Sequence, residues 1–201
     1  MSIVAAAVKN GKIAIAADSQ VNFGSLTASS KYMVGEHKIF KIQDSFIGLV
    51  GWSATCLATQ HLFNKHQDKL DFKDRYSIFE SLLKIQKILK DDYFFETRED
   101  DDDQPVESNQ IDGLIINSSG LFKISSYRDV TEYSKFWAVG AGRPYALGAM
   151  FASFDSLENA KDIAESGAHA ASEFSDSCGL PLQVFELDLK ADESPAPDKA
   201  P

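Results

Sequence analysis

The order of apolar and polar residues predicts two β-strands at the start of the chain. Residues 3–8 and 12–17 are small or β-branched, and Asn10-Gly11 between them is the dipeptide of a tight hairpin turn. Asp18 ends the second strand. The next segment, residues 19–30, is polar and is expected to form a loop or an irregular pair of strands.

Further along, strand-like and helix-like patterns come in separate blocks. Short apolar runs predict strands at residues 38–42, 46–50, 111–116, 121–125, 136–139 and 182–189. Apolar residues three and four apart predict helices at residues 53–68, 76–93, 145–154 and 157–174, the last N-capped by Ser156. Segregated strands and helices favour the α+β class over alternating α/β. Because two helices follow each group of strands, we expect a four-layer αββα sandwich.

A chain of 201 residues is long enough for one domain with its own core, which we assign to residues 1–190. Residues 96–109 include an acidic run and are interpreted as an exposed or disordered insert. The tail at residues 191–201 has three prolines, three acids and no large apolar side chain, so it is expected to be disordered.

The charge of the chain limits its partners. A net charge of −10 would repel nucleic-acid phosphates and anionic membrane surfaces, and no apolar run reaches membrane-spanning length. The two cysteines, Cys56 and Cys178, have neither a disulfide-scaffold nor a metal-ligand spacing. We therefore expect a cytoplasmic protein with no cofactor, no metal, no nucleic-acid partner and no membrane contact.

Ser2 is the residue of greatest chemical interest. Removal of Met1 would leave Ser2 with a hydroxyl and a free α-amine on the same residue. Since an α-amine titrates near neutrality, it can take the hydroxyl proton, and the residue would hold both a nucleophile and its base. Met-Ser is a common start for proteins, so a catalytic role for Ser2 needs support from residues later in the chain.

Four later segments have a recognisable pattern. They are Ala17-Asp18-Ser19-Gln20 followed by Gly24, His37-Lys38-Ile39-Phe40-Lys41-Ile42, Gly51-Trp52-Ser53-Ala54, and Gly140-Ala141-Gly142-Arg143-Pro144-Tyr145-Ala146. With them, the chain resembles the β-type subunits of the proteasome and its bacterial relative HslV, which are N-terminal nucleophile (Ntn) hydrolases. The resemblance covers most of the chain between Ser2 and about Leu189. In the size of the chain and in the Gly179-Leu180-Pro181 segment, the protein resembles the β-proteobacterial proteasome homologues in particular.

The resemblance implies four catalytic roles. Ser2 takes the place of the nucleophilic threonine, Asp18 that of the catalytic aspartate and Lys38 that of the catalytic lysine, while the Gly51 N–H forms the oxyanion hole. Lys38 would favour deprotonation of the neighbouring amine and hydroxyl through its charge, or carry the proton itself. Asp18 would hold Lys38 and balance its charge. One oxyanion donor contributes on the order of 3 kcal/mol. A serine lacks the methyl group that stiffens threonine, so we expect a slower nucleophile.

The same resemblance indicates three substrate-binding residues. Asn22 and Gly51 lie where the family pairs the substrate as an added strand, and Met33 lies near the specificity pocket. Trp52 has two interpretations. It either narrows that pocket toward small side chains or is a core aromatic, and the second is favoured.

Two positions depart from the family pattern. Ala141 stands where the family has a serine near the nucleophile's amine. The family also has an aspartate shortly before the last strand, and counting back from Gly179 gives Ser175 or Phe174 there. Asp176 is one step away, so a short slip in the chain would make it the candidate. We therefore expect reduced activity or a changed substrate.

The expected function is that of a threonine-type endopeptidase subunit with a serine nucleophile, self-compartmentalised in homo-oligomeric rings in a bacterial cytoplasm. Its substrates would be unfolded proteins or peptides. An ATPase partner is compatible with such a chamber, but no motif identifies one. Two alternatives stay open, namely a small-molecule amidohydrolase on the same fold and a catalytically impaired ring subunit.

Overall fold

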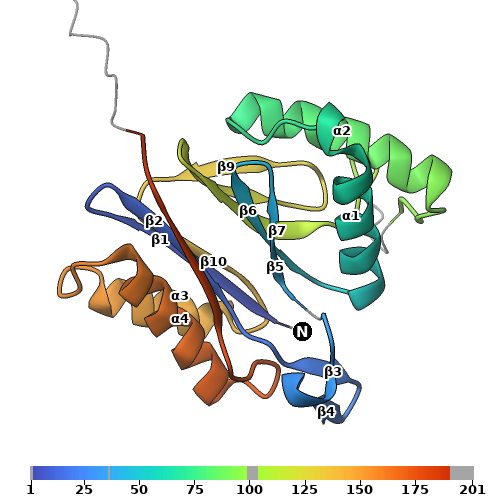
Figure 1. Cartoon of the computed structure of the whole chain (residues 1–201). Helices are drawn as coiled ribbons and strands as arrows, with labels where there is room; N and C mark the ends of the chain where they lie inside the picture. The colour runs from blue at the N-terminus through green and yellow to red at the C-terminus, as the bar shows by residue number, and fades with distance from the viewer. Residues whose placement is uncertain (1, 36, 99–103, 191–201) are drawn as a thin grey trace, which may run out of the picture.

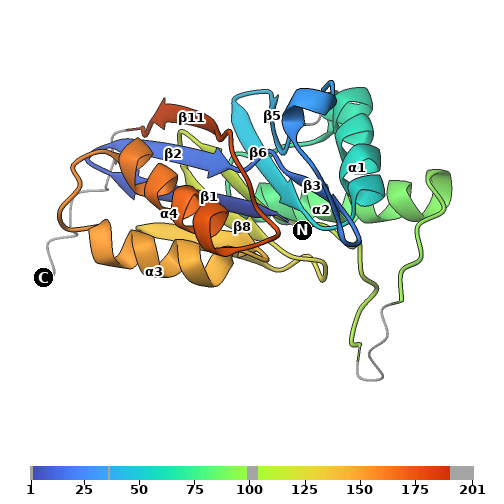
Figure 2. The same cartoon turned by 90° about the horizontal axis from the view of Figure 1, so that it is seen from below.

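The computed structural model describes residues 2–35, 37–98 and 104–190. Within them, two β-sheets lie face to face, and a pair of helices covers the outer face of each sheet (Figure 1). The view turned by 90° shows the same four layers (Figure 2). This arrangement confirms the αββα sandwich.

Both sheets are built from antiparallel neighbours. The first has the order β10-β1-β2-β11, with β1 Ile3–Lys9, β2 Lys12–Ala17, β10 Phe136–Gly140 and β11 Gln183–Asp188. The second runs in chain order, with β5 Ile39–Ile42, β6 Ser45–Val50, β7 Asp112–Asn117, β8 Gly120–Ile124 and β9 Val130–Tyr133. A small hairpin of β3 Val21–Phe23 and β4 Leu26–Ala28 stands apart from both sheets.

The helices form two pairs. Helices α1 (Ser53–His66) and α2 (Arg75–Asp92) cover the second sheet, and α3 (Arg143–Ser153) and α4 (Ala160–Phe174) cover the first (Figure 1). Two short 3₁₀ turns, Ser30–Tyr32 and Gln67–Lys69, complete the elements. The Asp74 carboxylate caps α2 by accepting hydrogen bonds from the N–H groups of Tyr76 and Ser77.

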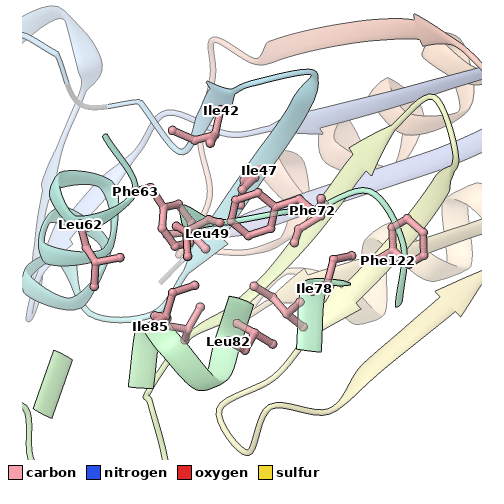
Figure 3. Close-up of a cluster of buried hydrophobic side chains, with 14 of the residues drawn as sticks. Ile42, Ile47, Leu49, Leu62, Phe63, Phe72, Ile78, Leu82, Ile85 and Phe122 are labelled. Carbon is pink, nitrogen blue, oxygen red and sulfur yellow. The ribbon is translucent and has the colours of Figure 1, made fainter. Parts of the chain in front are cut away.

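Alternation along β1 explains how the layers pack. Ile3, Ala5 and Ala7 face α3 and α4, whereas Val4 and Ala6 face the second sheet. The small residues of β1 allow a close approach of the helices to the first sheet. On the other side of the sandwich, larger aliphatic and aromatic side chains fill the space between the second sheet and its helices (Figure 3).

Most predicted elements are confirmed within a few residues, including the irregular strand pair of segment 19–30, which is β3–β4. Two points differ. Strand β9 was not predicted, because Val130–Tyr133 alternates too briefly and is only half buried. The predicted cap at Ser156 is wrong, since α4 begins after Asn159 and the Ser156 hydroxyl donates to the Ser153 carbonyl instead.

The acidic insert is described only at its flanks. Residues 94–98 and 104–109 form no helix or strand, and the Ser108 N–H donates to the Thr97 carbonyl at 2.9 Å, which joins the two flanks. Residues 99–103 of the insert, expected to be exposed or disordered, and the tail at 191–201, expected to be disordered, lie outside the described residues. None of the described helices is both long enough and apolar enough to span a membrane.

Candidate active site

Ser2 is buried immediately before β1, where its backbone is held from both sides. Its carbonyl oxygen accepts a hydrogen bond from the Gly142 N–H at 3.4 Å, and the next N–H, that of Ile3, donates to Asp18 Oδ1 at 2.9 Å. The pairing of β1 with β2 explains the second contact. Because Val4 lies opposite Ala17, the start of β1 lies beside Asp18 at the end of β2.

Asp18 is fully buried, and both of its carboxylate oxygens are occupied. Oδ1 also accepts from Lys38 Nζ at 2.6 Å, and Oδ2 accepts from the backbone N–H groups of Gln20 and Gly179 at 3.1 and 3.0 Å. A buried carboxylate needs partners of this kind, because an unpaired charge in the interior is very unfavourable. Since one oxygen binds both Lys38 and the Ile3 N–H, the ammonium lies close to the peptide bond after Ser2.

Lys38 has little freedom within this arrangement. Its side chain is 13% exposed, and Nζ also donates to the Gln20 carbonyl at 2.7 Å. Its backbone N–H donates to Gln183 Oε1 at 2.9 Å, so β11 fixes the start of the segment that leads into β5. The predicted pairing of Asp18 with Lys38 is therefore observed.

Two cavities meet at Ser2. One, of about 230 Å³, is lined by Ser2, Lys38 and Gly51 together with residues of the β3 strand and of α1. The other, of about 510 Å³, is lined by Ser2, Gly51, Trp52 and the starts or ends of further strands. Gly51 has φ = +120°, a conformation that favours glycine, and it connects β6 to α1 at this point.

The three predicted substrate-binding residues lie in different surroundings. Asn22 lines both cavities, while its side chain bonds with Gln20 and with the carbonyl of Asp176. Trp52 lines the second cavity and is 81% exposed, so its interpretation as a core aromatic is wrong. As the residue before α1, it projects from the turn after Gly51. Met33 lines neither cavity, although Gly35 and His37 nearby line the first.

The structure brings the backbone of Asp176 toward the site, but its carboxylate lines neither cavity. Its carbonyl accepts from Gln20 Nε2 at 2.7 Å, whereas Oδ1 accepts from the Ser177 hydroxyl at 2.8 Å. The residue is exposed. Ala141 lines the second cavity, so a methyl group faces it where the family pattern has a hydroxyl.

Sequence reasoning missed two side chains near Ser2. Gln20 stood out only as part of a motif, yet it connects β3 with the loop around Asp176. Asp112 lines the second cavity, and the only signal was an acid at the head of an apolar run. The Cys178 thiol lies nearby, but burial and the charge of Asp18 raise its pKa to about 11, so it stays protonated near neutral pH.

The site can therefore support nucleophilic chemistry at a serine. It combines a hydroxyl residue at the head of a strand, a cation held by a buried carboxylate, and a glycine turn with an exposed backbone, all around one cavity. Among the described residues, no group of three or more histidine, cysteine or acidic side chains could hold a metal ion.

Comparison with known proteins identifies the family. No protein-family model and no curated protein matches the sequence. Among solved structures, Thiobacillus denitrificans BPH, a bacterial proteasome homologue, is 34% identical, with a TM-score of 0.87, covering 94% of this chain and 100% of that one. The chain belongs to the BPH family.

A second structure of Thiobacillus denitrificans BPH, in complex with epoxomicin, has a TM-score of 0.86 at the same identity and coverage. HslV from Trypanosoma brucei is 17% identical, with a TM-score of 0.70 over 92% of this chain and 99% of that one, which supports the fold alone. This BPH-family chain is thus a proteasome-like Ntn hydrolase and a peptidase subunit of the threonine-peptidase type.

Proposed function

We propose that this BPH subunit cleaves peptide bonds with Ser2 as an N-terminal nucleophile, exposed when Met1 is removed. The observation that carries the proposal is the cavity shared by Ser2, Lys38 and Gly51, in which the Lys38 ammonium is held by Asp18 at 2.6 Å. The Asp18–Lys38 pair could stabilise the fold without facing a cavity. Its position at the cavity beside Ser2 therefore favours a role in chemistry.

Catalysis would proceed by acyl transfer in two stages. Ser2 Oγ attacks the substrate carbonyl carbon, and the free α-amine of Ser2 accepts the hydroxyl proton. The Gly51 N–H donates to the oxyanion of the tetrahedral intermediate. The proton then passes to the departing amine, which leaves an ester on Ser2. Water, deprotonated by the same α-amine, hydrolyses this ester and restores the enzyme.

Lys38 and Asp18 would act as a pair. The Lys38 charge favours the neutral amine and the ionised hydroxyl of Ser2, and Asp18 keeps the ammonium in place. Ala141 provides no hydroxyl to orient the amine, and the Asp176 carboxylate is directed to Ser177. The expected consequence is a slower acylation than a site with both groups would allow, with Asp176 acting mainly through its backbone carbonyl.

The substrate would bind as an extended strand between Asn22 and Gly51, which line both cavities. Trp52, which lines the second cavity, would then limit the side chains that fit there, whereas Met33, which lines neither cavity, would act only from outside their lining. The relative in complex with epoxomicin supports a site open to peptide-like molecules. Unfolded proteins or peptides are accordingly the proposed substrate class.

We further propose that the subunit works in closed homo-oligomeric rings, in a bacterial cytoplasm, with residues 1–190 as its single domain. Ring assembly in proteasome-like relatives supports this view. An ATPase partner would deliver folded proteins to these rings.

The decisive experiment is to trap the nucleophile in the purified protein. A peptide epoxyketone has two electrophilic carbons, so one residue captures it fully only with a hydroxyl and a free amine together. We expect an intact mass without Met1 and one adduct per chain, located on Ser2 by peptide mapping. Retention of Met1, or an adduct elsewhere, would contradict the proposal.

Two variants at the same position provide the control. Ser2→Ala removes the oxygen and is expected to abolish both adduct formation and peptide hydrolysis. Ser2→Thr keeps a hydroxyl, so activity is expected to remain and adduct formation to be as fast or faster, because the extra methyl restricts χ1. Hydrolysis that survives Ser2→Ala would assign the activity to another group.

A further inference from the structure

The second cavity forms where four strands come together. Ser2 precedes β1, Val50 ends β6, Asp112 begins β7 and Gly140 ends β10. These residues line the space together with Gly51, which follows β6. It lies against the first cavity, because Ser2, Asn22, Gly51 and Ser53 line both. An extended chain whose reactive carbonyl lies at Ser2 would therefore have one cavity on each side of the cleaved bond.

Asp112 has the only charged side chain among the lining residues of the second cavity, within the part of the chain that the structure describes. The register of β6 with β7 puts it directly opposite Val50, the residue before Gly51. Its Oδ1 is buried and accepts no hydrogen bond. The Gly113 N–H acts on the same carboxylate. Asp112 as a whole is only partly buried and lines the cavity, so a donor that enters the cavity can approach its carboxylate.

The charges near Asp112 do not neutralise it directly. Lys123 on β8 and Arg143 at the start of α3 act on the carboxylate from a distance, but neither forms an ion pair with it among the described residues. Gln110, two residues earlier, donates its side-chain N–H to the Glu96 carbonyl. The fold thus leaves a carboxylate at the cavity without a close cation of its own.

The remaining lining suits a long side chain with a charged end. Trp52 is 81% exposed at this cavity and presents an aromatic surface, on which an aliphatic stem can pack and a cation can be attracted. Val50, Gly140 and Ala141 add small apolar or backbone surface. A lysine or arginine side chain would match this combination of surface and charge.

We propose, on the basis of the proposed peptidase function, that the second cavity binds the residue immediately after the cleaved bond, and that Asp112 selects a basic side chain there. Asp112 would act as an acceptor for the ammonium or guanidinium group, with Trp52 supporting its stem. The role is one of specificity, distinct from the chemistry at Ser2.

The test compares three internally quenched peptides that differ only at the residue after the cleaved bond, which is lysine, norleucine or glutamate. Mass spectrometry of the products first establishes that the same bond is cut in each. We expect kcat/KM to be about tenfold higher for lysine than for norleucine, as for one charge-assisted hydrogen bond, and lowest for glutamate. In Asp112→Asn, the lysine-to-norleucine ratio is expected to fall to near one.

The matched control is Asp155→Asn, which removes one negative charge from an exposed position between α3 and α4. It should keep the lysine preference of the parent. A ratio that Asp112→Asn leaves unchanged would overturn the inference. An equal loss for all three peptides would also overturn it, because Asp112 would then act on Ser2 itself.

Failure of this inference can be told from failure of the proposed function. The rate of epoxyketone adduct formation at Ser2 is measured on the same preparations. An absent adduct in the parent protein contradicts the Ser2 mechanism. A normal adduct combined with an unchanged lysine-to-norleucine ratio contradicts only the role of Asp112.

Discussion

At the scale of single residues, Asp112 holds a charge for which the fold provides little compensation. Burial raises the pKa of its carboxyl group, against the opposing influence of Lys123 and Arg143. The folded chain therefore binds a proton that the unfolded chain has already released, and stability falls as the pH rises from the ordinary aspartate pKa through the raised one. The charged form of Asp112 therefore destabilises the fold, which is consistent with a role in binding a ligand.

The stability of Asp112→Asn tests this balance. The amide cannot ionise, so the variant is expected to melt at a higher temperature than the parent at pH 8. Well below the ordinary aspartate pKa of 3.8, where the parent carboxyl is protonated in both states, the difference should vanish. Thermal unfolding followed by circular dichroism across this pH range gives the measurement. A variant that is less stable than the parent at pH 8 would show that the charge stabilises the fold.

The residues around Ser2 differ in how far sequence could predict them. The position of Asp18 beside Ser2 could be predicted, because a tight hairpin places the end of β2 beside the start of β1. The pairing of Asp18 with Lys38 could be predicted only from the resemblance to the family. Asp112 could not be found, because its place at the cavity depends on the register between β6 and β7, across a long insertion. Asp176 and Met33 depend on loop conformation, which residue spacing does not determine.

At the scale of elements, the end of β10 limits how the chain approaches Ser2. Gly140 has φ = +102°, and a Cβ built there would lie 2.2 Å from the Ser2 carbonyl oxygen. No side-chain rotation can relieve this contact, because the backbone fixes the position of the Cβ and its partner is a backbone oxygen. The glycine therefore permits the close passage of two strands that holds Ser2 at the cavity.

Alanine at two glycines of neighbouring elements tests this constraint. Gly140→Ala is expected to lower stability by more than about 1 kcal/mol and to slow adduct formation at Ser2, because Ser2 must move. Gly148→Ala lies on an exposed turn of α3 with no atom within 4 Å of the new Cβ, and it should raise stability by about 0.5–1 kcal/mol. Chemical denaturation and trapping rates are measured on both. Similar behaviour of the two variants would contradict the constraint.

Element prediction succeeded where long-range packing and local pattern agree. The hairpin of β1 and β2 and the amphipathic helix α2 form where the pattern of apolar residues predicts them. Strand β9 gains its conformation from pairing with β8, since Leu121 lies opposite Tyr133 and Ile124 opposite Val130. The start of α4 at Ala160 similarly depends on the path of the chain after α3, with no side chain capping its first turn.

At the scale of the whole molecule, the net charge of −10 opposes assembly of identical copies. An interface between such copies is most favourable where it buries surface without charge. Segment 19–30 has no charged residue, and its β3–β4 hairpin exposes the cross-strand pair Phe23 and Leu26, at 63% and 71%. The hairpin lies beside the N-terminal end of β1 in both views (Figure 1, Figure 2). We therefore expect this hairpin to contact a second copy in the proposed ring.

The double variant Phe23→Ser with Leu26→Ser tests this interface by native mass spectrometry. It should shift the assembly toward smaller species and lower peptidase activity at low protein concentration, because Asn22 of the same hairpin lines both cavities. Phe94→Ser provides the control, since Phe94 is 88% exposed but precedes the acidic insert, where a second acidic copy would be repelled. Added salt should strengthen assembly of the parent by screening this repulsion. A double variant that keeps the mass and activity of the parent would contradict the contact at this hairpin, and loss of assembly in Phe94→Ser alone would place the contact near the acidic insert instead.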